Sequence, residues 1–457
     1  MPRPKSESIK DFLRTAIVTS MPMVPAQFDQ VEWQFVYVPE RHLRALETDT
    51  MLVTGVRGAG KSFWWYLLQQ NDYREALLGP QITISVGFGQ GADASRPEKD
   101  ELQQLLELGY NPRLIWKAVV LRQIAPHLTP FTDWRQLVNW VTENPSPSAA
   151  AFREFDAKLI QDRLSHIVLF DALDRTADNR KAREQLLSGL LQLVLELRGY
   201  RALRAKVFAR PDMLEAPEVK NFPDASKVFA SGTNLEWRIP DLYGLLFQYL
   251  GNASDKAAAA VFRDIAGGAV DEPLWLVPKA LRNDEDRQQK IFETIAGQYM
   301  GKNRRRGKTY TWVPNHLSDA AGKVSPRSFL AAIRKAAEEP TRHEYALDWS
   351  GIEEGVRYAS RIRVGEIQED LPWAHEAMKL LEDLAVPCDR SKIMSVWRSG
   401  NLLKNRLKGL PEDLDSIMGE LNRIGIFKVL PDGRINIPDV YRLGFGLRRK
   451  GSFAPRR

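Results

Sequence analysis

The chain has 457 residues, 44% of them hydrophobic, so it can build more than one buried core, and about 150 residues per domain predicts two to four domains. Lys and Arg outnumber Asp and Glu by 65 to 58, a formal net charge of +7, and residues 448–457 hold five of these cations. A single cysteine, Cys388, excludes an intramolecular disulfide and a cysteine-rich zinc site. The polar N-terminus and the lack of a run of about 18 apolar residues argue against a signal peptide and a membrane span, so we expect a cytoplasmic protein with no membrane contact.

The first strong signal along the chain is a phosphate-binding motif. Residues 34–45 combine a short apolar stretch, a proline and a basic helix. An apolar strand at residues 51–53 then leads into G-x-x-x-x-G-K-S/T, matched without a mismatch from Gly55 to Ser62, and a helix follows from Phe63. A strand before and a helix after are the context that this P-loop motif requires.

Each residue type of the motif has a role in holding a nucleoside triphosphate. Glycines let successive backbone N–H groups surround an anion at the helix N-terminus, Lys61 reaches the β- and γ-phosphates, and Ser62 ligates the metal. The alternative is a glycine-rich turn that contains Lys-Ser by chance, and the flanking strand and helix argue against it. We therefore expect Mg²⁺ and ATP, with GTP as the other candidate nucleotide. The predicted cofactor-binding residues are Gly55, Val56, Arg57, Gly58, Ala59, Gly60, Lys61, Ser62 and Phe63.

The residues after the motif alternate between strand and helix patterns, which is typical of a parallel α/β sheet. Residues 131–148, rich in proline, serine and tryptophan, are expected to form a surface insertion. The predicted fold class is therefore α/β, a P-loop NTPase core with a parallel sheet over residues 35–236, joined to an all-α lid and a C-terminal winged helix. The predicted strands of the core are 81–88, 166–170 and 206–209, and its predicted helices are 113–125 and 183–197.

Two aspartates follow the second of these strands. Residues 167–170 are apolar and bury the strand on both faces, so Asp171, the first acid after it, emerges at the carboxyl edge beside the P-loop. Asp171 is therefore predicted to hold Mg²⁺ together with Ser62. Asp174 is the candidate for polarising the attacking water, and its alternative role is the N-cap of the segment that begins near Arg175.

Two arginines of the core are candidates for the same site. Arg210 follows the third strand, where it can face the γ-phosphate, and the alternative is a surface arginine paired with Asp212. Arg175 either pairs locally with Asp171 or Asp174, which we favour, or reaches across a subunit interface as an arginine finger. The predicted catalytic residues are Lys61, Asp171, Asp174, Arg210 and, from the lid, Arg327.

The lid is predicted over residues 237–337, and a polar link, 338–371, follows it. Arg327 opens the last lid helix behind Ser325, a favoured cap, and a proline at the first turn. A cation is poorly placed at this end of the helix dipole, which favours a contact with the nucleotide over a solvated position. The predicted lid helices are 242–250, 257–266, 273–281, 286–299 and 328–337.

Residues 372–447 are predicted to be a winged helix, and residues 448–457 a basic tail. Three helical signals precede a strand, turn and strand, in which Asp432-Gly433 marks the hairpin. Residues 1–34 are assigned to an N-terminal extension. The predicted helices are 376–384, 391–397 and 414–424, and the predicted strands are 426–430 and 434–437.

Basic residues of the winged helix and tail indicate duplex DNA as a partner. A recognition helix in the major groove, with wing and tail contacts to phosphate, would explain their clustering. Acids on and before the third helix oppose this, and a protein interface is the alternative. The basic residues are Arg423, Lys428, Arg434 and Arg442, and the segment before the third helix adds Lys404, Arg406 and Lys408, with the polar Asn405 among them. The acids are Glu412, Asp413, Asp415 and Glu420.

A second basic segment, residues 302–308, precedes Tyr310 and Trp312. Basic residues beside aromatic ones suit a strand of nucleic acid. The alternative, a solvated loop beside a core tryptophan, is at least as frequent.

Taken together, the P-loop, the segment Asp171-Ala172-Leu173-Asp174-Arg175, the strand that ends in Arg210 and the Ser-Pro-Arg lid helix resemble the AAA+/STAND branch of P-loop NTPases. Residues 171–175 are most similar to the Asp-Asp-Leu-Asp-Arg of KAP-type NTPases, several of which are linked to phage exclusion. The layout of ATPase, lid and winged helix is similar to archaeal origin-recognition ATPases. Ala172 stands where these families carry an acid, which implies slow hydrolysis.

The resemblance implies a regulatory ATPase that switches with its nucleotide in a prokaryotic genome-defence or mobile-element system. Such a protein would act with DNA, with a separately encoded effector and as a nucleotide-dependent homo-oligomer. The first alternative is a DNA-stimulated loader ATPase for transposition or replication. The second is a scaffold that binds ATP and hardly hydrolyses it.

Overall fold

The computed structural model describes residues 6–21, 32–91, 93–268, 274–301, 304–340, 344–404, 407 and 409–449. The chain forms two compact units. One is Glu40–Glu236, which we call the sheet unit, and the other combines Met1–Pro39 with Trp237–Arg457, which we call the helical unit.

The sheet unit is built on five parallel strands in the order β2-β3-β4-β1-β5. The register places Thr54 of β1 beside Ala209 of β4, and Phe170 of β3 beside Val207. The three segments that follow β1, β3 and β4 therefore leave the sheet at one edge. The strands are β1 Leu52–Thr54, β2 Ile82–Phe88, β3 Ser165–Phe170, β4 Leu203–Ala209 and β5 Thr233–Asn234.

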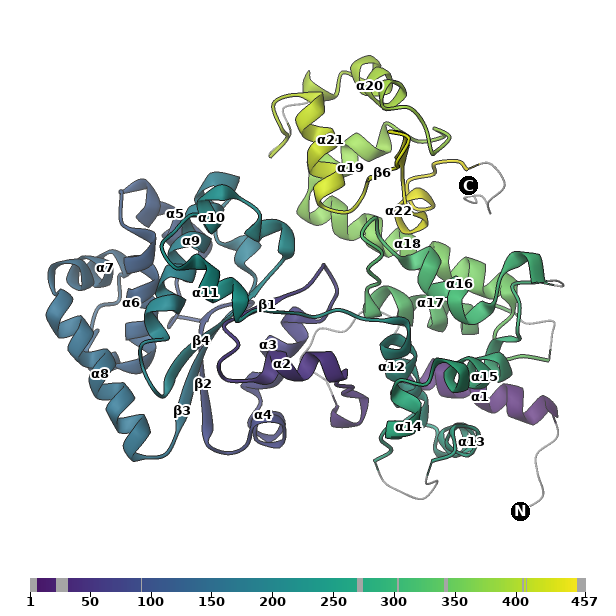
Figure 1. Ribbon diagram of the computed structural model, residues 1–457, viewed down its shortest axis with the longest axis horizontal. Helices are drawn as coiled ribbons and strands as arrows, with labels where there is room; N and C mark the ends of the chain where they lie inside the picture. The colour runs from purple at the N-terminus through teal and green to yellow at the C-terminus, as the bar shows by residue number, and fades with distance from the viewer. Residues whose placement is uncertain are drawn as a thin grey trace. The chain divides into compact units, whose positions relative to one another are not determined.

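Helices cover both faces of this sheet, with α6, α8 and α9 on one side and α3 and α4 on the other (Figure 1). This explains why residues 167–170 of β3 are fully buried and read as a continuous apolar run. The helices are α2 Leu43–Leu46, α3 Lys61–Gln69, α4 Asn71–Leu78, α5 Lys99–Glu107, α6 Pro112–Ile124, α7 Trp134–Glu143, α8 Pro145–Gln161, α9 Arg180–Leu197, α10 Pro217–Lys220 and α11 Ala225–Ala230.

The surface insertion expected at residues 131–148 is wrong. The segment forms α7 and the first turn of α8, and Leu137 and Val138 are fully buried in the core of the sheet unit. The misleading residues are those that begin helices: Asp133 accepts from the backbone N–H of Arg135, and Pro145 occupies the first position of α8. Proline at that position starts a helix because its missing N–H is not needed there.

The helical unit contains the other helices and one hairpin. Residues 274–278 of the expected helix 273–281 are not helical, because α14 begins only at Lys279, and residues 269–273 lie outside the described residues. Its elements are α1 Ser6–Ser20, α12 Ile239–Gly251, α13 Lys256–Ala266, α14 Lys279–Arg282, α15 Glu285–Ala296, α16 Thr309–Leu317, α17 Pro326–Glu338, α18 Trp349–Asp370, α19 Pro372–Lys379, α20 Arg390–Ser399, α21 Leu414–Arg423, β6 Lys428–Val429, β7 Ile435–Asn436 and α22 Asp439–Arg442.

Two segments expected to lie outside the domains are part of this unit. The assigned extension contains α1, which packs against α12, α13 and α17 and buries Leu13, Ala16 and Ile17. The assigned link contains α18, a helix of 22 residues that packs along α17. A Cβ at Gly355 of α18 would lie 2.1 Å from the carbonyl oxygen of Ala332, so this helix contact requires glycine. Because the residues at the contact are small and those on the exposed face are charged, the sequence of α18 has the composition of a polar link.

The histidine of β3 is expected to make the sheet unit sensitive to acid. His166 is 8% exposed, and both of its ring nitrogens are hydrogen-bonded to hydroxyls, of Thr83 at 2.8 Å and Ser85 at 2.9 Å. Burial lowers the pKa of His166 from 6.5 to about 4. Between these pH values the unfolded chain binds the proton more readily, so stability present above pH 6.5 is lost as the pH falls.

At about 1.4 kcal/mol per pKa unit, the loss between pH 6.5 and 4 approaches roughly 3 kcal/mol. Urea unfolding of the wild type and of His166→Gln across this range measures it, because the variant lacks the titrating ring. Equal pH slopes in the two proteins would contradict the assignment.

Candidate nucleotide site

The P-loop lies between β1 and α3, as the motif predicts. Gly58 and Gly60 adopt positive φ angles of 74° and 101°, a conformation that favours glycine, and Gly60 is the N-cap of α3. The Lys61 ammonium donates to the carbonyl oxygens of Gly55, at 2.8 Å, and Val56, at 3.1 Å. Burial lowers the pKa of Lys61 to about 8, which the charge of Asp171 opposes. The loop thus places the Lys61 ammonium at the N-terminus of α3, and the cation and the helix dipole together favour a bound anion.

Asp171 follows β3 at the same edge of the sheet and is 2% exposed. Burial raises the pKa of its carboxyl, and hydrogen bonding from the Ser62 hydroxyl and the charge of Lys61 oppose this. Its Oδ2 atom is buried and has no hydrogen-bond partner among the described residues. An orphaned carboxylate oxygen beside a hydroxyl fits Mg²⁺, which takes oxygen ligands and completes its shell with water and phosphate. Ser62 and Asp171 are therefore the residues that would hold this ion.

Those two residues do not form a metal cage by themselves. Within the described part of the chain, there is no group of three or more His, Cys, Asp or Glu residues arranged to hold a metal ion. Sites that bind Mg²⁺ with a nucleotide commonly use one or two protein ligands, so the donor set suits a metal shared with phosphates.

Asp174 and Arg210 meet beside Asp171. Arg210 Nη1 lies 3.6 Å from Asp174 Oδ2, and its Nε lies 3.3 Å from Asp212 Oδ1, with the arginine side chain 17% exposed. Arg210 therefore pairs with Asp212, as the alternative has it, but it is not a surface arginine, because its side chain is largely buried and shared with Asp174. Its role at the γ-phosphate stays a prediction. The alternative that Asp174 is an N-cap is wrong, because it lies inside the 3-10 turn Leu173–Arg175.

A further arginine at this site, Arg183 on α9, is not among the residues predicted from the sequence. Its Nη1 donates to the backbone oxygen of Asp174 at 3.4 Å, and burial, together with the charge of Arg210, lowers its pKa. A signal was present, because Arg180, Lys181 and Arg183 all lie at the N-terminal end of α9, where cations oppose the helix dipole.

The segment 171–175 differs from expectation at Arg175. This side chain is exposed and forms no ion pair with any carboxylate of the described residues, so the favoured pairing with Asp171 or Asp174 is wrong. The reach across a subunit interface stays a prediction. Ala172 adopts a left-handed φ of 55°, an uncommon conformation for a residue with a Cβ. Strain of this kind gathers at functional sites.

Arg327 belongs to the helical unit. The Ser325 hydroxyl caps α17 as expected, accepting from the backbone N–H of Ser328. Arg327 Nη1 donates to Glu366 Oε1 at 3.0 Å, and Arg363 Nη1 donates to the other oxygen of the same carboxylate at 2.9 Å. Glu366 lies on α18, in the segment assigned to the link, so the arginine is not merely solvated. Its contact with the nucleotide stays a prediction.

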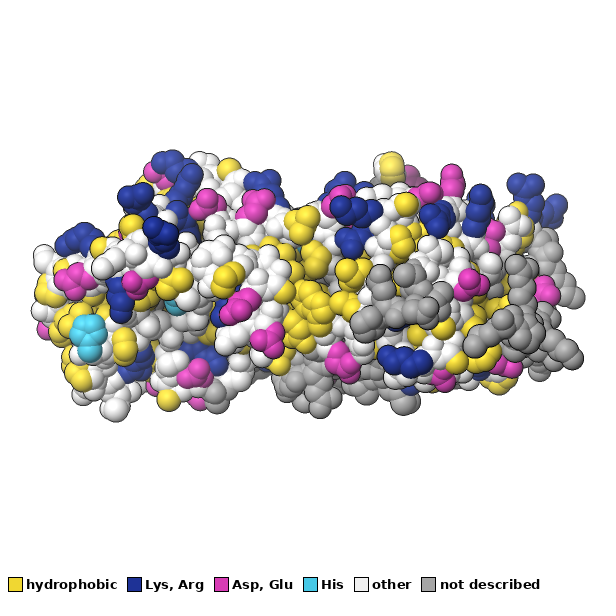
Figure 2. Space-filling model, turned by 90° about the horizontal axis from the view of Figure 1, so that it is seen from below, with side chains coloured by type: hydrophobic (Ala, Val, Ile, Leu, Met, Phe, Trp, Pro, Cys, Tyr) yellow, Lys and Arg dark blue, Asp and Glu magenta, His cyan; other side chains and the backbone are white. Residues whose placement is uncertain are grey.

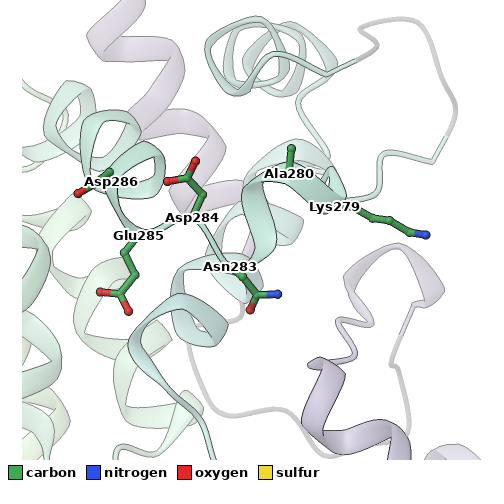
Figure 3. Close-up of a pocket in the computed structure, with 6 residues that line it drawn as sticks. All are labelled: Lys279, Ala280, Asn283, Asp284, Glu285 and Asp286. Carbon is green, nitrogen blue, oxygen red and sulfur yellow. The ribbon is translucent and has the colours of Figure 1, made fainter.

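A pocket of about 550 Å³ lies in the helical unit, on α14 and the start of α15 (Figure 3). It contains none of the predicted nucleotide-binding residues. Asp284, one of its acids, caps α15 by accepting from the backbone N–H of Arg287. The pocket is lined by Lys279, Ala280, Asn283, Asp284, Glu285 and Asp286.

Most arginines predicted to contact DNA are engaged in ion pairs. Arg442 is fully buried and donates to Asp439 at 2.6 Å, so its predicted role is wrong. In the tail, Arg448 and Arg449 pair with Asp383 and Asp439, at 2.7 and 3.0 Å. Asn405, Arg406, Lys408 and residues 450–457 lie outside the described residues.

The basic segment 302–308 follows its alternative reading. Tyr310 is 1% exposed and donates to Gln288, and Trp312 stacks on His316 with ring centroids 3.8 Å apart. These rings therefore belong to the packing of the unit, while residues 304–308 are exposed. Lys302 and Asn303 lie outside the described residues.

Comparison with known proteins gives likeness of structure only. No family model and no curated protein matches the chain. ORC1 of Aeropyrum pernix, solved with DNA, is 14% identical over 91% of this chain and 92% of that one, with a TM-score of 0.38. ORC2 of the same organism, in ADPNP–ADP complexes, is 12% identical over 89% of this chain and 93% of that one, with a TM-score of 0.40. A Walker-type ATPase of Pyrococcus abyssi is 13% identical over 89% of this chain and 98% of that one, with a TM-score of 0.36.

Because every TM-score is below 0.5, the assignment of function rests on the residues of this chain. Among the described helices, none is both long and apolar enough to cross a membrane.

Proposed function

We propose that the chain is a Mg²⁺-dependent ATPase of the AAA+ class that acts as a slow switch together with duplex DNA. The observation that carries the proposal is the pairing of the P-loop with Asp171, whose buried Oδ2, beside Ser62, has no hydrogen-bond partner within the described part of the chain. A phosphate cradle and an orphaned carboxylate oxygen are the two halves of a metal–nucleotide site.

Each residue of the site has a separate proposed role. Lys61 and the backbone N–H groups of the P-loop bind the phosphates, and Ser62 and Asp171 hold the metal. When bound, Mg²⁺ supplies charge neutralisation to the phosphate oxygens. Asp174 accepts a proton from, or orients, the attacking water, and Arg210 faces the charge that develops on the γ-phosphate.

Slow turnover is part of the proposal. Ala172 offers no second carboxylate, and Asp174, the other acid at this edge, lies 3.6 Å from Arg210. The guanidinium of Arg210 competes with the attacking water for this carboxylate, which slows hydrolysis. ATP then stays bound for longer before it is hydrolysed, and a long-lived nucleotide-bound state suits a switch.

We further propose that this switch is a KAP-like regulator in a prokaryotic genome-defence or mobile-element system. It would act in the cytoplasm with a separate effector and as a homo-oligomer. The exposed Arg175, close in sequence to both aspartates, supports an oligomer because it is available to a neighbouring site. A loader ATPase for transposition or replication, and a scaffold that binds ATP with little hydrolysis, remain the competing proposals.

Turnover of ATP and GTP by the purified chain, with and without duplex DNA and with Mg²⁺ or EDTA, tests the proposal. We expect slow ATP turnover that requires Mg²⁺ and changes when DNA is added. Strong stimulation by DNA would favour the loader, and tight binding without turnover would favour the scaffold. Failure to bind either nucleotide would refute the proposal.

A further inference from the structure

Helix α20 carries an exposed face of Lys, Arg and Ser side chains. At about 100° of rotation per residue, the five residues of this face fall within an arc of roughly 120°. We call it the α20 face, and all five side chains are exposed. They are Ser391, Lys392, Ser395, Arg398 and Ser399.

The opposite side of α20 fixes the direction of this face. Ile393 and Trp397 are fully buried, and the Trp397 indole N–H donates to the carbonyl oxygen of Ala377 at 2.8 Å. The same ring stacks on Phe427, with centroids 6.1 Å apart and planes at 7°. Because the helix is anchored to α19 and to the segment before the hairpin, the α20 face is held toward solvent.

The cations of this face are not neutralised by neighbours. Residues 390–411 contain six Lys and Arg residues and no acid, and Asp389 precedes them. Lys392, Arg398 and the exposed Lys404 form no ion pair with a carboxylate of the described residues. Arg390 lies off the face and pairs with Asp415 of α21. The net charge of the α20 face is therefore available to a polyanion.

Helix α21, the predicted recognition helix, differs from α20 in carrying acids among its cations. Its exposed surface includes Asp415, and its cation Arg423 is held by Glu420. On the hairpin, Arg434 is held by Asp432. On the face seen in Figure 2, Lys and Arg side chains likewise lie among Asp and Glu. Helix α20 lies at the outer edge of the group that it forms with α19, α21 and β6 (Figure 1).

We propose that the α20 face, extended by Lys404, binds the phosphate backbone of duplex DNA, and that α21 does not enter the major groove. The inference rests on the DNA partner of the proposed function and names the surface that meets it. Lys and Arg neutralise phosphates and serine hydroxyls donate to them, contacts that position a duplex without reading its sequence.

Fluorescence anisotropy of a labelled duplex of arbitrary sequence, titrated with the full chain over a range of salt concentrations, tests this. Lys392→Ala/Arg398→Ala should weaken binding about tenfold or more at ~100 mM salt. It should also reduce the slope of log affinity against log salt by about 2, one for each lost phosphate contact. Ser395→Glu, which adds an anion to the face and removes no cation, should weaken binding as well.

The matched control is Arg423→Ala/Arg434→Ala, which also removes two cations from the C-terminal part but takes them from α21 and the hairpin. We expect a much smaller change in affinity and slope. An equal loss from both double variants, or a loss from the control alone, would overturn the proposal. Thermal unfolding checks that each variant is folded, and the exposed positions are expected to tolerate the changes.

The wild type must bind the duplex for the inference to hold. Anisotropy is therefore measured without nucleotide and with ATP, and the absence of binding in both states would overturn it. That result would leave the ATPase proposal standing, because turnover is measured separately. A chain that binds DNA through α20 but never binds ATP would refute the proposed switch and leave this surface assigned.

Discussion

Lys61→Ala is expected to reduce ATP turnover by about 100- to 1,000-fold, the cost of removing one donor that stabilises charge in a transition state. The Lys61 ammonium lies inside the loop on the carbonyl oxygens of Gly55 and Val56, so an alanine removes the cation that the loop itself holds in place. Nucleotide affinity should fall as well, because the lysine meets the phosphates before and during hydrolysis. Steady-state phosphate release and binding of a fluorescent ATP analogue measure the two effects.

The control for this variant is Lys158→Ala, which removes an exposed cation from α8 of the same unit. It should leave turnover and nucleotide affinity near those of the wild type. If Lys61→Ala hydrolysed ATP at the rate of this control, the P-loop would not be the site of hydrolysis.

Asp171→Asn is expected to lower turnover about 100-fold or more while ATP still binds. Asparagine keeps the size of the side chain and one oxygen, but it removes the negative charge that would hold Mg²⁺ with Ser62. The concentration of Mg²⁺ needed for half-maximal turnover should therefore rise. Turnover as a function of Mg²⁺, together with calorimetric titration of the ion in the presence of a non-hydrolysable ATP analogue, measures both effects.

Asp174→Asn distinguishes the role of Asp174 from that of Asp171. It removes the carboxylate that lies 3.6 Å from Arg210 and should slow hydrolysis without changing the Mg²⁺ requirement. An unchanged Mg²⁺ requirement in Asp171→Asn, or a raised one in Asp174→Asn alone, would contradict the assignment of the metal to Asp171.

The nucleotide site could be predicted from sequence because its parts are local. The P-loop occupies eight consecutive residues from Gly55 to Ser62, and Asp171 directly follows an apolar strand. Turn chemistry and strand burial act over a few residues, so the pattern determines the backbone there. The contacts around these residues were harder to predict. Arg183 reaches the backbone oxygen of Asp174 because the 3-10 turn Leu173–Arg175 and the first turn of α9 are brought together by the fold.

Surface and interior were harder to tell apart in the C-terminal half. Arg442 reads as a basic residue near a DNA-binding module, yet it is fully buried on Asp439. Tyr310 follows a basic loop, yet it packs in the core. In both cases the side chain is satisfied by a partner on another turn or another helix, and a charge or an aromatic ring alone does not reveal that partner.

The P-loop, the strand with its aspartate and the helix-rich second half follow from local sequence, because each depends on neighbouring residues. Which charged side chains remain available to a partner depends on tertiary packing. Lys206 of β4 is fully buried and donates to the carbonyl oxygens of Ala45, Glu47 and Thr50, about 160 positions earlier in the chain. Lys392, by contrast, stays exposed on α20. A charged side chain can be buried only where the fold brings polar groups to it, and otherwise it stays exposed and available to a partner. For Lys206 those polar groups are distant in sequence.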